Sequence, residues 1–197
     1  KAFRQLVWSQ DAKSFLKCHI LAFEHFNGVP EIVCLDNLKA GVIKSSVDND
    51  MLNRSYKELA EYYGFMISPC LPRTPEHKGG VENDIKYNKS NFWAQIREKQ
   101  KTYLKLTLKE AQEDLDKWDK EVANVRKIRV MRRSPEEIFT FEEKDALKSL
   151  PNDRFEPTDW FQCIVRKEWW IIHESSYYSV PYNLIGKTVQ VRATTDF

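Results

Sequence analysis

Short apolar runs alternate with helical patterns through the first third of the chain, and this alternation restricts the fold more than any other feature. The run "EIVCLDN" (31–37) is bounded by turn residues, which is typical of a strand covered on both faces in a parallel sheet. "KAFRQLVW" (1–8) and "FMIS" (65–68) are two further candidate strands, with helical spacing at 12–26 and 54–64 between the three. Strand, helix, strand, helix and strand predict an α/β layer.

The expected helix ends carry recognisable capping residues. Ser9 or Asp11 is the expected cap of the first helix, Gly28 its stop, and Gly64 the C-cap of the second. Two prolines and the pair Gly79–Gly80 then precede Glu82, which predicts a loop that turns sharply and delivers Glu82 in the first turn of a long helix. We expect this loop to be mobile without ligands.

A capping box at Thr107-x-x-Glu110 opens a further helix with a heptad seam, listed as Leu108, Ala111, Leu115, Trp118, Val122 and Val125. The seam is too short for a free coiled coil, so it is expected to pack on the core. From Phe155 onward the pattern changes to closely spaced short strands, which favours a small barrel or sandwich. The predicted domains are a core at 1–128, a linker at 129–154 and a β-domain at 155–197.

The composition is that of a globular protein without a membrane anchor. The 197 residues are 42% apolar, enough for one or two domains, and contain neither a membrane-length apolar run nor a signal-peptide pattern. The four cysteines are widely spaced and are interpreted as reduced thiols. Because the net charge is only +2, any case for nucleic-acid binding must rest on where the charges lie.

Two acids stand out as candidates for catalysis. Asp36 falls at the end of a predicted strand, followed by Asn37 and Lys39, and this edge of an α/β sheet is where ligands bind. Glu82 comes 82 − 36 = 46 positions later. Carboxylates from two such elements can converge on a divalent cation, although a turn at Asp36 and a helix-dipole role for Glu82 are the simpler alternatives.

Three motifs in order, "CLDNLKAGV" (34–42), "RTPEHKGGVEN" (73–83) and "YYSVPYNLIGKTVQVR" (177–192), resemble the IstA-type transposases of bacterial insertion sequences. That family belongs to the DDE transposases and retroviral integrases, which have an RNase H-like core. The resemblance implies an α/β, RNase H-like core followed by a small β-barrel. It also implies that Asp36 and Glu82 are the second and third catalytic acids, holding two Mg²⁺ ions that Mn²⁺ can replace, with Asn37, Lys39, Gly79 and Gly80 as supporting residues.

Cations near these acids are the candidates for DNA binding. A first group lies close to Glu82: Arg73, His77, Lys78, Lys86 and Lys89. A second group lies in "RKIRVMRR": Arg126, Lys127, Arg129, Arg132 and Arg133. Lys86 and Lys89 share a helix face with Glu82 and Trp93, and they match lysines that contact the DNA end in integrases. In both groups a solvated charged surface is the alternative.

The first aspartate of the triad has no candidate in this chain, because Asp11 is better explained as a helix cap. We therefore expect that aspartate and the first strands of the core upstream of Lys1, and further barrel strands beyond Phe197. The implied activity is metal-dependent cleavage at transposon ends and 3′-hydroxyl strand transfer into target DNA. The alternatives are an RNase H-like nuclease without strand joining and a non-catalytic DNA-binding scaffold.

The resemblance also implies partners and a location. It predicts transposon-end and target DNA, a homo-oligomer, an AAA+ ATPase that selects the target, and a bacterial cytoplasmic, nucleoid-associated protein.

Overall fold

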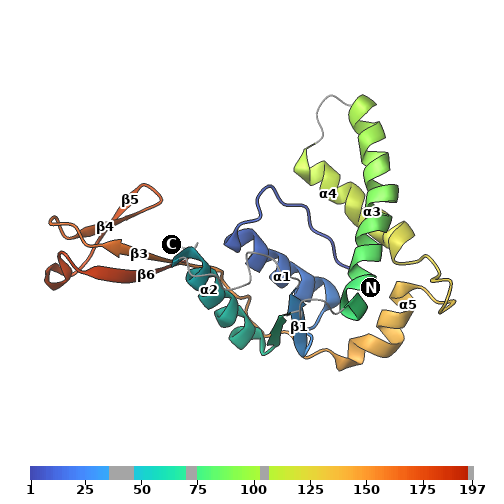
Figure 1. Ribbon diagram of the computed structural model, residues 1–197, viewed down its shortest axis with the longest axis horizontal. Coiled ribbons are helices and arrows are strands. Elements are labelled where there is room, and N and C mark those ends of the chain that lie inside the picture. The colour runs from blue at the N-terminus through green and yellow to red at the C-terminus, as the bar shows by residue number, and fades with distance from the viewer. Residues whose placement is uncertain (36–46, 70–74, 103–106, 195–197) are drawn as a thin grey trace.

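The computed structural model describes residues 1–35, 47–69, 75–102 and 107–194 (Figure 1). Helices α1 and α2 and strand β1 occupy the middle of the molecule. The long helix α3 and its neighbour α4 lie at one end, and two β-ribbons extend from the other (Figure 1). The protein is therefore a mixed α/β structure, as the sequence predicts.

The middle of the molecule is built on a β-α-β unit. Strand β1 (Ile32–Leu35) pairs in parallel with β2 (Met66–Pro69), and α2 (Val47–Tyr63) connects them. Helix α1 (Ala12–Phe26) and α2 bury their apolar faces against this pair, with Leu16, Phe23 and Leu59 almost fully enclosed. The expected helices and the parallel pairing are confirmed, because the apolar spacing of each element matches its own period.

Two details of this layer differ from the prediction. The β1–β2 pair is covered on one face only, because Val33 and Leu35 pack inward while Ile32 and Cys34 are exposed. Residues 1–8 form no strand either. The backbone of residues 1–8 forms hydrogen bonds with side chains of other elements instead of with a neighbouring strand. The Leu6 amide, for example, donates to Gln112 Oε1 of α4 at 2.8 Å.

Helix α1 begins and ends with residues that satisfy its free backbone groups. Asp11 is the N-cap and accepts a hydrogen bond from the Ser14 amide at 2.7 Å. At the other end Asn27, not the expected Gly28, adopts the left-handed conformation, with φ of 52°. Gly28 is required by space, because a Cβ there would lie 2.7 Å from Cβ of Leu147.

Helices α3 (Pro75–Thr102) and α4 (Leu108–Trp118) form a second apolar cluster around Phe92, Leu115 and Trp118. The capping box of Thr107 and Glu110 is present as predicted. The heptad seam ends early, because a π-helical turn, η1 (Asp119–Ala123), follows α4 directly. Its wider turn shifts the register by about one residue, so Ala123 is buried while Val122 and Val125 are exposed.

The segment predicted to be a linker packs against the core. It contains α5 (Pro135–Ile138), the π-helical η2 (Phe139–Glu143) and the 3₁₀-helical η3 (Lys144–Ala146). Val29 and Lys148 then exchange two backbone hydrogen bonds, at 2.9 and 2.8 Å. These contacts fix the path that leads the chain from α3 and α4 back past α1.

The C-terminal strands appear where the sequence predicts them, as two antiparallel ribbons. One pairs β3 (Thr158–Ile164) with β6 (Thr188–Thr194), and the other pairs β4 (Trp170–His173) with β5 (Ser176–Ser179). The β4–β5 turn has positive φ at both central residues, 45° and 64°, as two-residue hairpins favour. In the described residues these ribbons are separate sheets and do not close into a barrel.

Glu58 and Arg54 of α2 attach ribbon β3–β6 to that helix. Glu58 accepts hydrogen bonds from Thr158 Oγ1 at 2.9 Å and from Trp160 Nε1 at 3.1 Å. The Arg54 guanidinium lies 3.3 Å from the centre of the Trp160 ring and also donates to Gln190.

Among the described helices, none is long and apolar enough to cross a membrane.

Candidate functional site

The candidate site lies where β1 and β2 end. Because these strands are parallel, their carboxyl ends share one edge, and Leu35 is the register partner of Pro69. Asp36 follows Leu35 directly in the sequence, and α3 begins at Pro75, 75 − 69 = 6 positions after the end of β2. The predicted site residues Asp36, Asn37, Lys39 and Arg73 themselves lie outside the described residues.

The helix that carries Glu82 begins earlier than the sequence suggested. It begins at Pro75, so Glu82 is residue 82 − 75 + 1 = 8 of α3 and lies beyond the first turn. Gly79 and Gly80 are helical, and their interpretation as a loop is wrong. Proline suits the first helical position because its missing N–H needs no partner there, and a long helix tolerates the roughly 1 kcal/mol cost of each glycine. The side chains of His77, Lys78 and Glu82 lie outside the described part.

Further along α3, Lys86 and Lys89 occupy exposed positions. Both are one to two turns after Glu82, so the backbone of α3 presents the three residues along one side. Trp93, which the sequence assigns to the same side, packs instead against the apolar cluster of α3 and α4. The charged side of α3 therefore ends at Trp93, and the two lysines lie next to a packed aromatic surface.

A groove of about 850 Å³ brings together cations from both predicted DNA-binding groups. It lies between the N-terminal segment and α3, and Lys89 and Arg126 both line it. Lys1 also lines the groove, and Phe92 and Trp93 contribute apolar surface. Residues 37 positions apart in sequence (126 − 89) thus share one surface.

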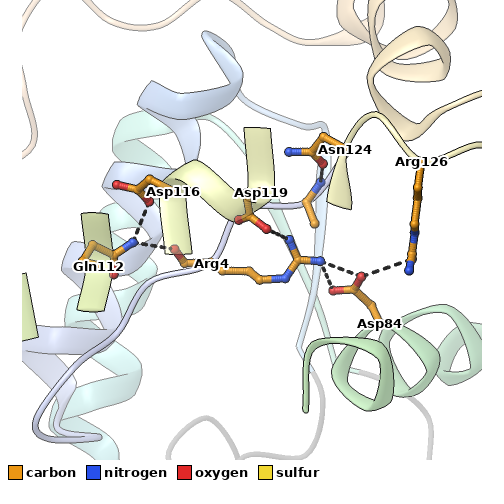
Figure 2. Close-up of polar contacts among 8 residues, drawn as sticks. Arg4, Asp84, Gln112, Asp116, Asp119, Asn124 and Arg126 are labelled. Atoms are coloured by element: carbon orange, nitrogen blue, oxygen red, sulfur yellow. Dashed lines mark hydrogen bonds and ion pairs between the residues drawn. The ribbon is translucent and has the colours of Figure 1, made fainter. Parts of the chain in front are cut away.

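A partly buried charge network beside α3 was not predicted from the sequence (Figure 2). Arg4 donates to both carboxylate oxygens of Asp84 at 2.6 Å, and also to Asp119. Arg126 approaches Asp84 from the other side at 3.8 Å. The network joins the N-terminal segment to α3 and to the π-helical turn η1, and no local sequence signal marks it because its members are 80 and 115 positions from Arg4.

Side-chain amides hold the backbone of the N-terminal segment on both sides of Arg4. Gln112 donates to the Arg4 carbonyl at 3.1 Å (Figure 2). Gln112 also accepts from the Leu6 amide at 2.8 Å. Asn124 accepts from the Ala2 amide at 3.4 Å. These bonds fix the backbone around Arg4, whose guanidinium then donates to Asp84 of α3 and to Asp119 of η1.

Asp119 is the most perturbed acid of this network. Its side chain is only 11% exposed, and burial raises its pKa to about 6. The charge and hydrogen bond of Arg4 oppose that shift, while the neighbouring charges of Asp84 and Asp116 add to it. The Arg4 guanidinium therefore offsets part of the free-energy cost of keeping the buried Asp119 carboxylate ionised.

The second basic group splits into two members that are engaged by partners within the protein and three that are exposed. The Arg126 guanidinium lies 3.4 Å from the centre of the Tyr87 ring, and Arg133 pairs with Glu142. Lys127, Arg129 and Arg132 are exposed. Only part of the predicted patch therefore faces outward.

No metal site is formed by the side chains that the structure describes. In this part of the chain no three His, Cys, Asp or Glu residues lie close enough together to hold an ion. The predicted ligands Asp36 and Glu82 are not among the described side chains, so the metal assignment stays a prediction.

Comparison with known proteins identifies relatives over nearly the whole chain. Residues 150–196, which include both ribbons, match the family model of the Mu transposase C-terminal domain. A protein assigned as a transposase in Mycobacterium tuberculosis is 34% identical over 195 residues, covering 98% of this chain and 46% of the relative. The transposase for insertion sequence element IS21 of Pseudomonas aeruginosa is 32% identical over 189 residues, covering 95% and 46%. Nearly the whole of this chain is thus similar to insertion-sequence transposases.

The resemblance to insertion-sequence transposases is thus confirmed. The chain spans less than half the length of these relatives, 46% in both cases. A third relative, assigned as a transposase in Sinorhizobium fredii, is 31% identical over 196 residues, covering 98% of this chain and 37% of its own length.

Proposed function

We propose that this chain contributes the second and third acids, Asp36 and Glu82, of a DDE active site in an RNase H-like core. The parallel pairing of β1 and β2 is the observation that supports this most strongly. It gives one sheet edge from which both the segment beginning at Asp36 and the approach to α3 depart. Two carboxylates 46 positions apart in sequence can meet at such an edge.

The donor chemistry of these residues fits Mg²⁺, which prefers carboxylate oxygens. We propose that an aspartate from a part of the transposase outside this chain completes the set, and the greater length of the relatives leaves room for it. Bound there, Mg²⁺ supplies positive charge to the attacking and leaving oxygens of an in-line displacement. Mn²⁺ is expected to substitute.

The chain's own residues have the task of positioning DNA. Lys86 and Lys89 follow Glu82 on α3 and can contact the phosphates of a transposon end. Hydrolysis at that end frees a 3′-hydroxyl, and this hydroxyl then attacks a phosphodiester of target DNA. The Arg4 network supports the proposal indirectly, because it fixes α3 two positions after Glu82, at Asp84.

The remaining parts of the proposal concern architecture and partners. Ribbons β3–β6 and β4–β5 would belong to a small β-barrel completed outside this chain, following the domain boundaries predicted from the sequence. Transposon-end and target DNA, a homo-oligomeric assembly and an AAA+ ATPase for target selection are the expected partners. A bacterial, nucleoid-associated protein is the corresponding location.

A strand-transfer assay on the full-length protein tests the proposal. With a labelled transposon end and Mg²⁺, Asp36→Asn and Glu82→Gln should each abolish cleavage and joining but keep end binding. Glu113→Gln removes an exposed acid of α4 and serves as the control, with activity unchanged. If the wild-type protein cleaves the end without forming a joined product, it is a nuclease. If the wild-type protein binds the end but catalyses neither reaction, it is a scaffold.

A further inference from the structure

The chain forms a closed loop between η1 and α5. The loop begins at Asn124 and ends at Glu136, whose amide donates to the Asn124 carbonyl at 3.0 Å. Asn124 is buried, so the two ends of the loop meet at a fixed point. A compact surface loop with adjoining ends is an Ω-loop, and such loops commonly carry function.

The tip of this loop has a defined backbone. Ile128 donates to the Arg133 carbonyl at 2.8 Å, and Arg132 donates to the Ile128 carbonyl at 2.7 Å. These bonds close a four-residue tip, Arg129–Arg132. Arg132 lies in the left-handed region with φ of 54°, a conformation that costs a side chain of this kind about 1 kcal/mol and that glycine adopts freely. Folding alone would favour glycine at this position.

Two arginines anchor the base of the loop. Arg126 packs its guanidinium on Tyr87 and approaches Asp84 (Figure 2), and Arg133 pairs with Glu142. Next to Arg133, Ser134 begins α5 with a capping box. The base is therefore held by contacts to α3 and to the segment after α5, while the tip projects from it.

The tip exposes an apolar pair between cations. Val130 is 91% exposed and Met131 is 60% exposed. Arg129 and Arg132 flank them, Lys127 is nearby and exposed, and no acid occurs from Arg126 to Arg133. Neither apolar side chain is part of either core cluster. Two exposed apolar residues are too few for a protein interface of ordinary size, which buries roughly 800 Å² per partner.

We propose that this tip is a wedge for duplex DNA. Val130 and Met131 enter the minor groove and pack against sugars and base edges, while Lys127, Arg129 and Arg132 contact the phosphates on both sides. Proteins that widen the minor groove combine apolar wedges with flanking cations in this way. The proposal rests on the proposed function, since it assigns a DNA-contacting element to the transposase, and it explains why Arg132 keeps a side chain in a glycine conformation.

Equilibrium binding of the full-length protein to a labelled duplex of arbitrary sequence tests the wedge. The double variant Val130→Ser/Met131→Ser should bind about tenfold more weakly with an unchanged salt slope, because it loses apolar contact only. Arg129→Gln should lower the slope of log K against log salt by about 0.9, the value for one phosphate contact. Lys144→Gln removes an exposed cation outside the loop and should change neither quantity.

Arg132→Gly separates folding from binding most sharply. It should leave the thermal midpoint equal or higher, because glycine suits the conformation, yet lower the salt slope by about 0.9. A minor-groove ligand such as netropsin should compete with the wild-type protein for the duplex. The same ligand should reduce DNA binding by the double serine variant much less. Unchanged DNA affinity in the double serine variant, or loss of binding to a protein instead of DNA, would overturn the wedge.

These results are independent of the catalytic assignment. If Asp36→Asn abolishes strand transfer while the tip variants bind DNA normally, the wedge is wrong and the transposase proposal stands. If strand transfer survives Asp36→Asn while the tip variants bind DNA weakly, the wedge stands as a DNA contact and the catalytic proposal fails.

Discussion

Replacing Arg4 by methionine should destabilise the chain by about 3 kcal/mol near pH 8. Methionine keeps much of the apolar stem but removes the guanidinium, which is the partner of both Asp84 and Asp119. Asp84 is one-third exposed and retains Arg126, so most of the cost falls on Asp119. Removing one partner of a buried ion pair typically costs 3–5 kcal/mol, and we expect roughly the lower limit.

The loss should depend on pH in a defined direction. Burial raises the pKa of Asp119 to about 6, and removing Arg4 should raise it further, because the charge of Arg4 lowers it. The folded state then holds a proton that the unfolded state, with an ordinary pKa near roughly 4, releases. Stability therefore falls as the pH rises through this window, and at pH 5, where Asp119 is largely protonated when folded, the loss should shrink to about 1–2 kcal/mol.

Urea unfolding at pH 5 and pH 8, followed by tryptophan fluorescence and circular dichroism, measures this difference. Lys109→Met is the matched control, because Lys109 pairs with Glu113 at 3.9 Å and both side chains are largely exposed. That control should cost less than about 0.5 kcal/mol at either pH. A loss below about 1 kcal/mol for Arg4→Met at pH 8, or an equal loss at both pH values, would refute the reasoning.

Three further predictions concern the rest of the fold. Glu58→Gln should weaken the attachment of ribbon β3–β6 by about 1–2 kcal/mol, seen as faster amide exchange in β3 and a changed Trp160 emission; unchanged exchange would contradict it. Burial lowers the pKa of His19, so stability should fall as the pH drops below its ordinary value near roughly 6.5, and His19→Gln should flatten that dependence in acid titrations. Gly28→Ala should cost about 1–3 kcal/mol in denaturant unfolding, since its Cβ would clash with Leu147, and a neutral result would show that the contact relaxes.

Local patterns predicted the elements of this fold well. Helix α1, the parallel strands and the capping box at Thr107 follow from spacing and end signals within a few residues, whereas α2 begins at Val47, seven positions before the predicted start at residue 54 (54 − 47 = 7). A second capping box, Ser134-x-x-Glu137, was present in the sequence and could have been recognised in the same way. These features were accessible because each depends on neighbours along the chain.

Features that depend on distant partners were not accessible. Residues 1–8 alternate like a strand, yet Gln112 and Asn124 take their backbone hydrogen bonds. The π-helical turn η1 interrupts a seam whose periodicity gave no warning. The Arg4 network joins residues up to 115 positions apart, and only the folded chain brings them together.

The candidate site was predicted from a strand end and a family resemblance. The structure adds the shared sheet edge and corrects the start of α3 to Pro75, seven positions before Glu82 (82 − 75 = 7). The roles of Asp36 and Glu82 remain predictions, because they depend on side chains that converge across two elements. Helix preference and pairing register, which govern the described part, do not determine that convergence.

Cleavage of the polypeptide by bound iron tests the convergence of Asp36 and Glu82 most directly. With Fe²⁺ in place of Mg²⁺ and ascorbate present, hydroxyl radicals cut the backbone close to the metal. In the full-length protein we predict cuts near both residue 36 and residue 82, suppressed by excess Mg²⁺. Asp36→Asn alone should abolish both cuts. Cuts at only one of the two positions, or cuts at both that persist in Asp36→Asn, would contradict a shared metal site.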